Sequence, residues 1–373
     1  MALKNWESFD CFTTADLPNI YTAFGHVQLG GTMTATIVEG GGRNGDKCLR
    51  IIPGSHALKN LTHQIQGKSF STGVSAGDTV VCHFAMKVNT FNESGFCYFA
   101  AIQSNAGVGD GLYNILLAIN AAKQIVVGHS VSSTLSAGNF TGVSTTILAV
   151  GVWVHVAVKF KAHATTGTVE VQINGITEIG PLTSIDTSTS DTGVSALVLG
   201  ATIPDTVIPS IDFDDVVICD TSGTTNNDFL GDQQVLQRKP VGNGNSSQLL
   251  GSDANSTDNY LLVDDDTDPD DDTTYNQSAT TGDKDTYAYE DLPAEITTIK
   301  AVGVRTIGKK LTAAAKDVKA VARSSGTEAD SGPLGFIDGA YTARRAVFEV
   351  DPNTSTAWTP TTYNAAEFGA KIA

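Results

Sequence analysis

Alternating apolar and polar positions mark much of residues 26–220 as β-strands separated by Gly, Asn and Ser turns. The longest such run is residues 79–88, whose apolar composition predicts a core strand. The pair Asn174-Gly175 follows one of these strands and is the strongest local hairpin signal, because both turn positions need a positive φ. Many short strands at this spacing predict a β-sandwich or jelly roll. The expected strands are 79–88, 96–103, 113–120, 124–129, 153–160, 168–173 and 211–220.

The pattern changes after residue 220. Residues 221–295 are rich in Asn, Ser, Gly, Thr and Asp, with an acidic run at 264–272, and such runs usually lie in solvated loops. Apolar residues persist there, so we expect an ordered, loop-rich connecting segment. In residues 296–373, alternation around Val302, Val304 and Val318 predicts a second, smaller β-sandwich-like domain, with a helix at 309–322 as the alternative. The expected organisation is therefore all-β, in segments 1–220, 221–295 and 296–373.

Composition narrows the class of protein. The chain has 373 residues, 41% hydrophobic and 17% charged, which suits a folded protein of two domains and disfavours disorder. A net charge of −17 disfavours nucleic acid as a partner, and no apolar segment predicts a secretory signal or a membrane span. The odd number of scattered cysteines favours buried, reduced thiols: Cys11, Cys48, Cys82, Cys97 and Cys219.

Several stretches resemble a known family. Residues 153–158, 169–175 and 211–217 are similar to strands of the concanavalin A-like (laminin-G-type) jelly roll. A second resemblance is to structural proteins of tailed bacteriophages that carry this jelly roll. It rests on residues 7–10, 16–17, 21, 228–232, 285–287, 299–304, 351–354, 357–359 and 368–369, taken in order. The resemblance implies a virion component that is assembled in the host cytoplasm and displayed on the capsid surface or the tail.

The acidic residues of the last jelly-roll strand are the candidates for catalysis. Asp212 and Asp214 share one face of the strand, and glycoside hydrolases use two carboxylates about 5–10 Å apart. The Glu-x-Asp-x-x-Glu pattern of jelly-roll glucanases is absent, and the apolar run 216–218 follows at once. We therefore expect structural carboxylates and assign no catalytic residue.

Metal and ligand motifs are weak. No HExxH, His-x-His or CxxC spacing exists, and His83 and His155 lie among apolar strand residues. Alternating aspartates at 264, 266, 268 and 270 suit calcium, but Pro269 and Tyr275 replace the Gly and Glu of an EF-hand, which favours a solvated run. Residues 40–47 lack the phosphate-loop pattern, which favours a turn or bulge loop. The three tryptophans are expected in the core more than on a sugar-binding surface: Trp6, Trp153 and Trp358.

These observations favour a non-enzymatic virion structural protein without cofactor or metal. It would act through contacts with identical copies, with a trimer expected, and with other capsid or tail proteins. The alternative is a glycan-binding adsorption module on a tail or head fibre, whose partner would be host surface glycan. A glycoside hydrolase ranks third. Neither nucleic acid nor membrane is an expected partner.

Overall fold

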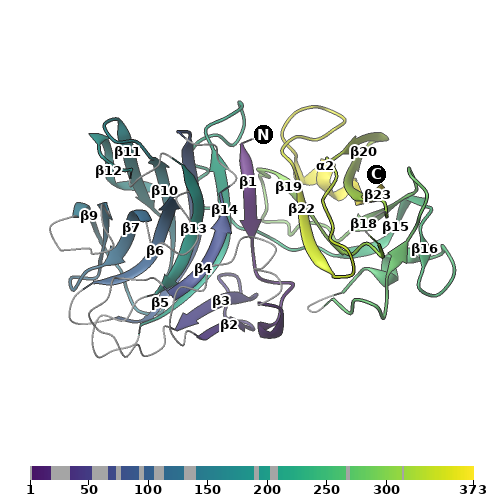
Figure 1. Cartoon of the computed structure of the whole chain (residues 1–373), viewed down its shortest axis with the longest axis horizontal. Coiled ribbons are helices and arrows are strands. Elements are labelled where there is room, and N and C mark those ends of the chain that lie inside the picture. Colours follow the sequence, from purple (N-terminus) through teal and green to yellow (C-terminus); the bar gives the residue numbers. More distant parts are fainter. Residues whose placement is uncertain are drawn as a thin grey trace. The chain divides into compact units, whose positions relative to one another are not determined.

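The computed structural model divides the chain into two compact units, Met1–Val235 and Leu236–Ala373 (Figure 1). It describes residues 2–17, 34–52, 66–72, 77–91, 96–104, 113–129, 140–188, 193–201, 209–265, 269–312 and 315–373. Strands dominate both units, so the all-β prediction is confirmed. No helix in these ranges is long and apolar enough to cross a membrane.

In its described residues, the first unit contains two antiparallel sheets. The first sheet has the strand order β12 (Ile176–Ile185), β11 (Gly167–Ile173), β10 (Trp153–Lys161), β5 (Thr79–Thr90), β14 (Ser210–Asp220), β3 (Cys48–Ile52) and β2 (Thr34–Val38), with β1 (Leu3–Glu7) also paired to β14. The second sheet has the order β4 (Gln66–Ser71), β13 (Val194–Ala201), β6 (Cys97–Ser104), β7 (Tyr113–Ile119), β8 (Gln124–His129) and β9 (Phe140–Ile147). A 3-10 helix, η1, spans Thr14–Asp16.

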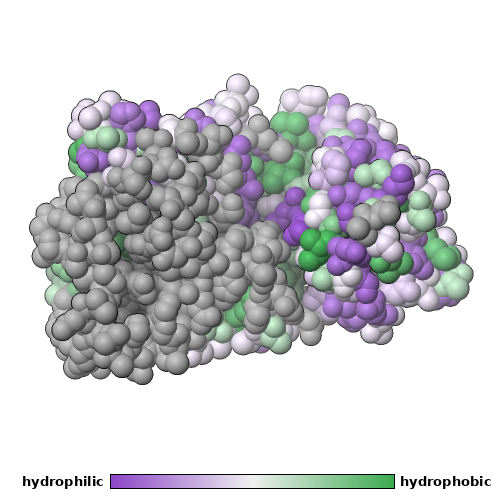
Figure 2. Space-filling view, viewed as in Figure 1, coloured by the Kyte–Doolittle hydropathy of each residue, from purple (hydrophilic) through white to green (hydrophobic). Residues whose placement is uncertain are grey.

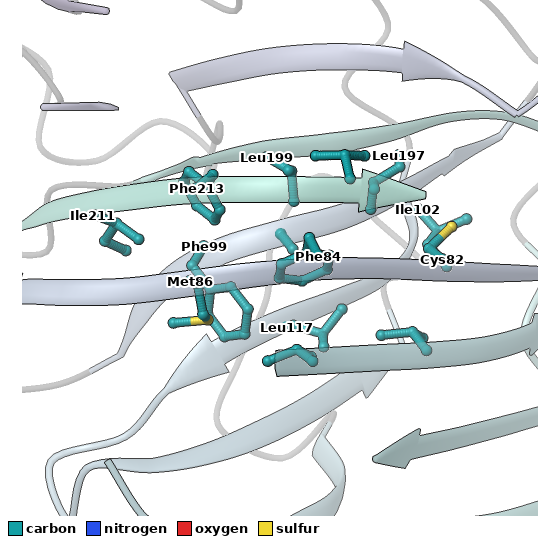
Figure 3. Packing of buried hydrophobic residues seen from close by; sticks show 14 of the residues in the cluster. Cys82, Phe84, Met86, Phe99, Ile102, Leu117, Leu197, Leu199, Ile211 and Phe213 are labelled. Carbon is teal, nitrogen blue, oxygen red and sulfur yellow. The ribbon is translucent and has the colours of Figure 1, made fainter. Parts of the chain in front are cut away.

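The apolar face of each sheet lies in the layer between them. Alternation along β5 places Phe84 and Met86 in the main core, and both are fully buried. Figure 3 shows them beside side chains of the second sheet such as Phe99 and Leu199. Burying each such side chain stabilises the fold by about 1.5–3 kcal/mol before conformational entropy is subtracted. The period-2 pattern thus determines which face of each strand is free to carry polar groups.

A hairpin turn and a β-bulge both contain residues with a positive φ. The predicted hairpin turn is present: Asn174 and Gly175 have φ values of 50° and 78° between β11 and β12. In β14 the pairing with β5 shifts register between Asp214 and Val217, and Asp215 has a φ of 51°. This bulge turns the Asp215 carboxylate toward the segment that follows β14, as its bond from the backbone of Val235 shows.

The described residues of the second unit form three small sheets. The largest has the order β15 (Pro240–Ser247), β18 (Lys284–Tyr289), β23 (Glu367–Ile372), β20 (Val318–Ser324) and β21 (Thr327–Asp330). The others pair β16 (Leu250–Gly251) with β17 (Asn276–Gln277), and β19 (Val302–Gly308) with β22 (Thr342–Phe348). Short helices η3 (Asn259–Leu262) and α2 (Pro360–Asn364) complete it. Its core centres on Trp358 and Phe368, and Figure 2 shows hydrophilic residues interspersed with small apolar areas over its surface.

Residues 221–295, expected as a connecting segment, are divided between the two units. Residues 221–235 belong to the first unit, and 236–295 supply β15 to β18 of the second. A polar centre orders this part where an apolar one is lacking: Asp285 is fully buried and accepts bonds from Leu249 N, Asn259 Nδ2 and Tyr287 Oη. The helical alternative for 309–322 is not adopted in its described residues, because 318–322 form part of β20.

Candidate functional site

The outer face of the first sheet carries several of the unit's buried charged groups. Asp212 on β14 lies directly opposite Arg50 on β3 and Lys87 on β5. Arg50 donates from Nε to Asp212 Oδ1 at 2.6 Å and from Nη2 to Oδ2 at 2.9 Å. Lys87 Nζ lies 3.1 Å from Oδ2. The fully buried Asp212 carboxylate is therefore neutralised by two cations from the neighbouring strands.

Asp214 and Asp215 are bound mainly by loop residues and by the backbone, and not by side chains of the neighbouring strands. Asp214 Oδ2 accepts from the backbone N of Arg43 at 3.0 Å, and Oδ1 accepts from Asp215 N at 2.8 Å. The Arg43 guanidinium lies 3.6 Å from Asp215 Oδ2 and also pairs with Asp232. The sequence suggested a bulge loop at 40–47, and this loop positions the one arginine that faces both buried aspartates.

Negative charge exceeds positive charge around this arginine. Burial, followed by the charge of Asp215, raises the pKa of Asp214. Burial also raises the pKa of Asp215, against the bond from Val235 N and the charge of Arg43. Nearby, burial and the charge of Asp46 raise the pKa of Asp10 to about 6. These carboxyl groups therefore hold protons at higher pH than exposed ones do.

Residues 228–235, which we name the covering segment, lie over this face. At one end Lys159 Nζ donates to Asp228 Oδ1 at 2.9 Å, and at the other Val235 N donates to Asp215 Oδ1 at 2.7 Å. Between them Leu230 N donates to His83 Nε2 at 3.4 Å. The segment thus links β10, β5 and β14 by polar contacts.

Two histidines are brought together under this segment. The rings of His83 on β5 and His155 on β10 stack with centroids 5.4 Å apart, and Phe229 meets His83 edge-on at 6.3 Å. His155 is 1% exposed, and neither of its ring nitrogens has a hydrogen-bond partner. Burial lowers the pKa of His155 well below its usual value, so the ring is neutral near pH 7.

Burial keeps a substrate from reaching the carboxylates of this face. Asp212, Asp214 and Asp215 are all at most 2% exposed, so no open groove separates two of them. Within the described ranges, no three His, Cys, Asp or Glu side chains converge as metal ligands would. The arrangement is that of buried, internally paired charges that bind loops to a sheet.

The outer face of the second sheet is apolar. Its side chains form a separate cluster in which Tyr98, Leu116 and Val126 are nearly fully buried. Burial raises the pKa of Tyr98 to about 12, so its hydroxyl stays protonated at neutral pH. Polar members beside the cluster, Gln103 and Asn114, are neutral amides. Acid–base catalysis on this face would need a group that can take up a proton and a cation beside it. The described side chains of the face include no such pair.

The remaining residues considered in the sequence analysis are the acidic run, the other histidines, the tryptophans and the cysteines, and they do not form one site. In the acidic run, Asp272 pairs with Lys309 at 2.6 Å and Asp270 accepts from Thr274 N at 3.0 Å, so both are held by the second unit's own groups. Asp266 and Asp268 lie outside the described residues, as do His26, His56 and His63. Trp358 is in the second core, whereas Trp153 is half-buried beneath Lys87 Nζ, 4.8 Å from the ring centroid. The five cysteines are buried thiols, as predicted.

Sequence reasoning found the acidic residues but missed their partners. Arg43, Arg50 and Lys87 are separated from residues 212–215 by more than a hundred positions, and no local spacing connects them. The covering segment was seen only as part of a loop-rich region. One available signal was the unusual density of three aspartates on a strand that otherwise faces the core, since buried carboxylates need cationic partners.

Comparison with known proteins adds a likeness of fold. No family model and no curated protein matches the chain. An endo-β-1,4-glucuronan lyase from the fungus Trichoderma reesei matches 54% of this chain and 93% of its own, with 14% identity and a TM-score of 0.41. The cellulose-induced protein Cip1 matches 53% and 91%, with 13% identity and a TM-score of 0.40. A carbohydrate esterase of the Shiga toxin-encoding bacteriophage phi24B matches 58% and 99%, with 15% identity and a TM-score of 0.36. The likeness concerns the fold alone.

The predicted β-sandwich is confirmed by the strands of the chain itself. The described strands of the first unit form two antiparallel sheets with an apolar layer between them, and additional small sheets follow in the second unit. At these identities a shared fold does not transfer an activity, because function depends on the residues of a site.

Proposed function

We propose that the chain is a non-enzymatic structural protein of a tailed-phage virion, displayed on the capsid surface or the tail. The supporting observation is the internal use of the charged groups on the first sheet: Asp212 is bound by Arg50 and Lys87, and none of the three is free to act on a substrate. The assignment to a virion is supported by the sequence resemblance of the N-terminal residues and the second half of the chain to phage structural proteins. Its mechanism is assembly, in which rigid sandwiches present surfaces to copies of themselves and to neighbouring virion proteins.

An assay on polysaccharides tests the non-enzymatic part. We would incubate the purified protein with glucuronan, the polymer named for the fungal lyase of similar fold. The expected result is no change in polymer length over that of a boiled control. Cleavage that disappears in Asp212→Asn would contradict the proposal. Cleavage that persists in that variant would contradict it as well, and would move the search to the second sheet.

Immunogold labelling of the phage that encodes the chain tests the virion part. Antibodies raised against the purified protein should label either the head or the tail at regular positions. Absence of the protein from purified particles, by labelling and by peptide mass spectrometry, would overturn this part of the proposal.

The alternative is a glycan-binding adsorption module on a tail or head fibre. A jelly roll offers loops and a sheet face for sugars. The described residues of the second sheet's outer face are apolar and buried, which favours the structural role. Binding to isolated host surface polysaccharide in a glycan array would reverse this order.

A further inference from the structure

One edge of the first unit carries exposed apolar side chains and a stretch of sequence that has no charged residue. Within its described ranges, every large hydrophobic residue that is exposed lies between positions 143 and 176 and is 52% to 67% exposed. We name this set the edge patch: Val143, Ile147, Val150, Val152 and Ile176. Exposed apolar residues gathered on one part of a protein surface commonly mark an interaction site.

Hydrogen bonds hold the strands that carry the edge patch together. Residues of the patch come from β9, from β12 and from the loop that leads into β10, and β9 and β12 are the outermost strands of their sheets. Glu178 on β12 accepts from Thr145 N at 2.7 Å and from Thr146 Oγ1 at 2.6 Å, both on β9. Ile147 follows Thr146 directly, and Ile176 lies two residues before Glu178. This link joins the two strands that carry Ile147 and Ile176, the two most exposed residues of the patch.

The connecting loop is tied down as well. Leu148 N donates to Lys123 O at 2.8 Å, and Gly151 N donates to Val88 O at 2.9 Å. The backbone that presents Val150 and Val152 is therefore bonded to two other elements. A contact made here would not first have to order a loop, so it would avoid that entropic cost.

We propose that the edge patch is a contact surface between copies of this chain; the proposal rests on the structural role above. The occupant follows from charge. The chain carries a net charge of −17, yet from Gln124 to Val158 its sequence has no Asp, Glu, Lys or Arg. A basic partner would be drawn to the acidic surfaces. An equally acidic partner, above all an identical copy, approaches best where repelling charge is absent.

Two charged groups beside the edge patch, Glu178 and Lys123, do not oppose this contact. The Glu178 carboxylate is already occupied by the backbone and hydroxyl groups of Thr145 and Thr146. Lys123 is exposed at the margin, with its Nζ 5.2 Å from the centroid of the Phe91 ring. A cation there attracts an acidic copy.

The contact uses side chains in preference to a shared sheet. Strand β12 is interrupted by register shifts against β11, and Pro181 in it has no N–H to donate. On β9, the N–H groups of Thr145 and Thr146 donate to Glu178. Extending either sheet into a second copy is therefore disfavoured, whereas packing of Ile147, Val150 and Ile176 is open.

Light scattering of charged variants tests the edge patch. The double variant Ile147→Asp/Ile176→Asp is compared with Val241→Asp/Leu261→Asp, whose residues are 51% and 52% exposed on the second unit. We expect the wild type and the second-unit variant to share one oligomeric mass, and the patch variant to fall to the monomer mass of 38.9 kDa. Circular dichroism and the unfolding midpoint report whether each variant folds.

Crosslinking provides a readout that does not depend on a disruptive substitution. All five native cysteines are buried, so a new surface cysteine is the reactive one. A short bis-thiol reagent should join two copies of Val150→Cys and not of Val241→Cys. If the patch variant keeps the wild-type mass and Val150→Cys does not crosslink, the edge patch is wrong while self-association stands. A wild type that is monomeric at every concentration overturns both. Polysaccharide cleavage by an oligomeric protein overturns the structural role alone.

Discussion

Arg50 donates two hydrogen bonds to the Asp212 carboxylate, from Nε to Oδ1 at 2.6 Å and from Nη2 to Oδ2 at 2.9 Å. Their strands are adjacent, and the two residues face each other across the ladder. A carboxylate that is fully buried and held in this way braces the sheet and has no free lone pair directed at solvent.

Replacing Asp212 by Ala should lower the free energy of unfolding by about 3 kcal/mol. That is the low end of the range for breaking a buried ion pair, because the Arg50 side chain remains 32% exposed and partly solvated. Chemical denaturation of the full chain measures it. The matched control is Glu39→Ala, which removes an ion pair to Lys47 from a side chain that is 69% exposed, and it should cost less than about 1 kcal/mol. Equal losses in the two variants would refute the bracing role.

Stability of the first unit should fall as the pH rises from 5 to 8. Burial raises the pKa of Asp10 to about 6 and also raises the pKa values of Asp214 and Asp215. For a carboxyl group whose pKa is raised on folding, the folded state binds more protons than the unfolded state. Its contribution is complete below about pH 4 and is lost as the pH passes the folded value. Thermal unfolding at both pH values checks this, and Asp214→Asn should reduce the slope. A stability that increases over this range would contradict the assignment.

The histidine pair acts in the opposite direction at lower pH. Burial lowers the pKa of His155, so its stabilising neutral state is complete above about pH 6.5 and is lost as the pH falls toward the folded value. His155→Gln should therefore lose less stability than the wild type between pH 6 and pH 4, as measured by the unfolding midpoint. Identical acid profiles for the two proteins would show that the ring is already protonated or is solvated.

Removing Arg43 should release the covering segment. Its guanidinium bonds to Gln233 O at 3.2 Å and pairs with Asp232, while Asp215 holds Val235 N. We expect Arg43→Ala to speed hydrogen exchange at the amides of residues 230 and 235 by at least tenfold at pH 8 and by less at pH 5, where Asp214 and Asp215 are more protonated. Lys159→Ala is the control at the other end of the segment and should affect residue 228 and not 235. Unchanged exchange in Arg43→Ala would show that the other contacts of the segment hold it without Arg43.

The link between the two sheets at Glu178 should be visible in acid. Bonds from the hydroxyl and backbone groups of Thr146 and Thr145 lower the pKa of Glu178 to about 2. Its stabilising charge is therefore present above about pH 4.5 and is lost as the pH falls through about 2. Glu178→Gln, which keeps the shape but halves the acceptors, should lower the unfolding midpoint at pH 7 and leave it nearly unchanged near pH 2. An equal decrease at both pH values would show that the loss is one of packing.

Strands with strong alternation were predictable from the sequence, and edge strands were not. The run 79–88 reads directly as β5, because its Phe84 and Met86 face the core between polar or outward positions. Strand β12 was missed because its residues are mostly exposed and its order is broken by Gly180 and Pro181. In the second unit, burial of Asp285 among amides replaces an apolar pattern, and no period in the sequence reports it.

The charged face was predictable only in part. That Asp212 and Asp214 are structural follows from the apolar residues after them. That Arg43 lies against Asp214 depends on tertiary structure, since the two are 171 positions apart. The stacking of His83 and His155 required the antiparallel register of β5 and β10, which places His83 opposite Ala157 and His155 opposite Ala85. Neither relationship has a local sequence signature.

The central claim is that this chain works by assembling with itself, and the mass of the purified wild-type protein in solution tests it most directly. Multi-angle light scattering across a dilution series should give a fixed multiple of 38.9 kDa, with three copies expected from the sequence and a two-fold dimer if the edge patch meets its own counterpart. A mass of 38.9 kDa at every concentration would contradict the account.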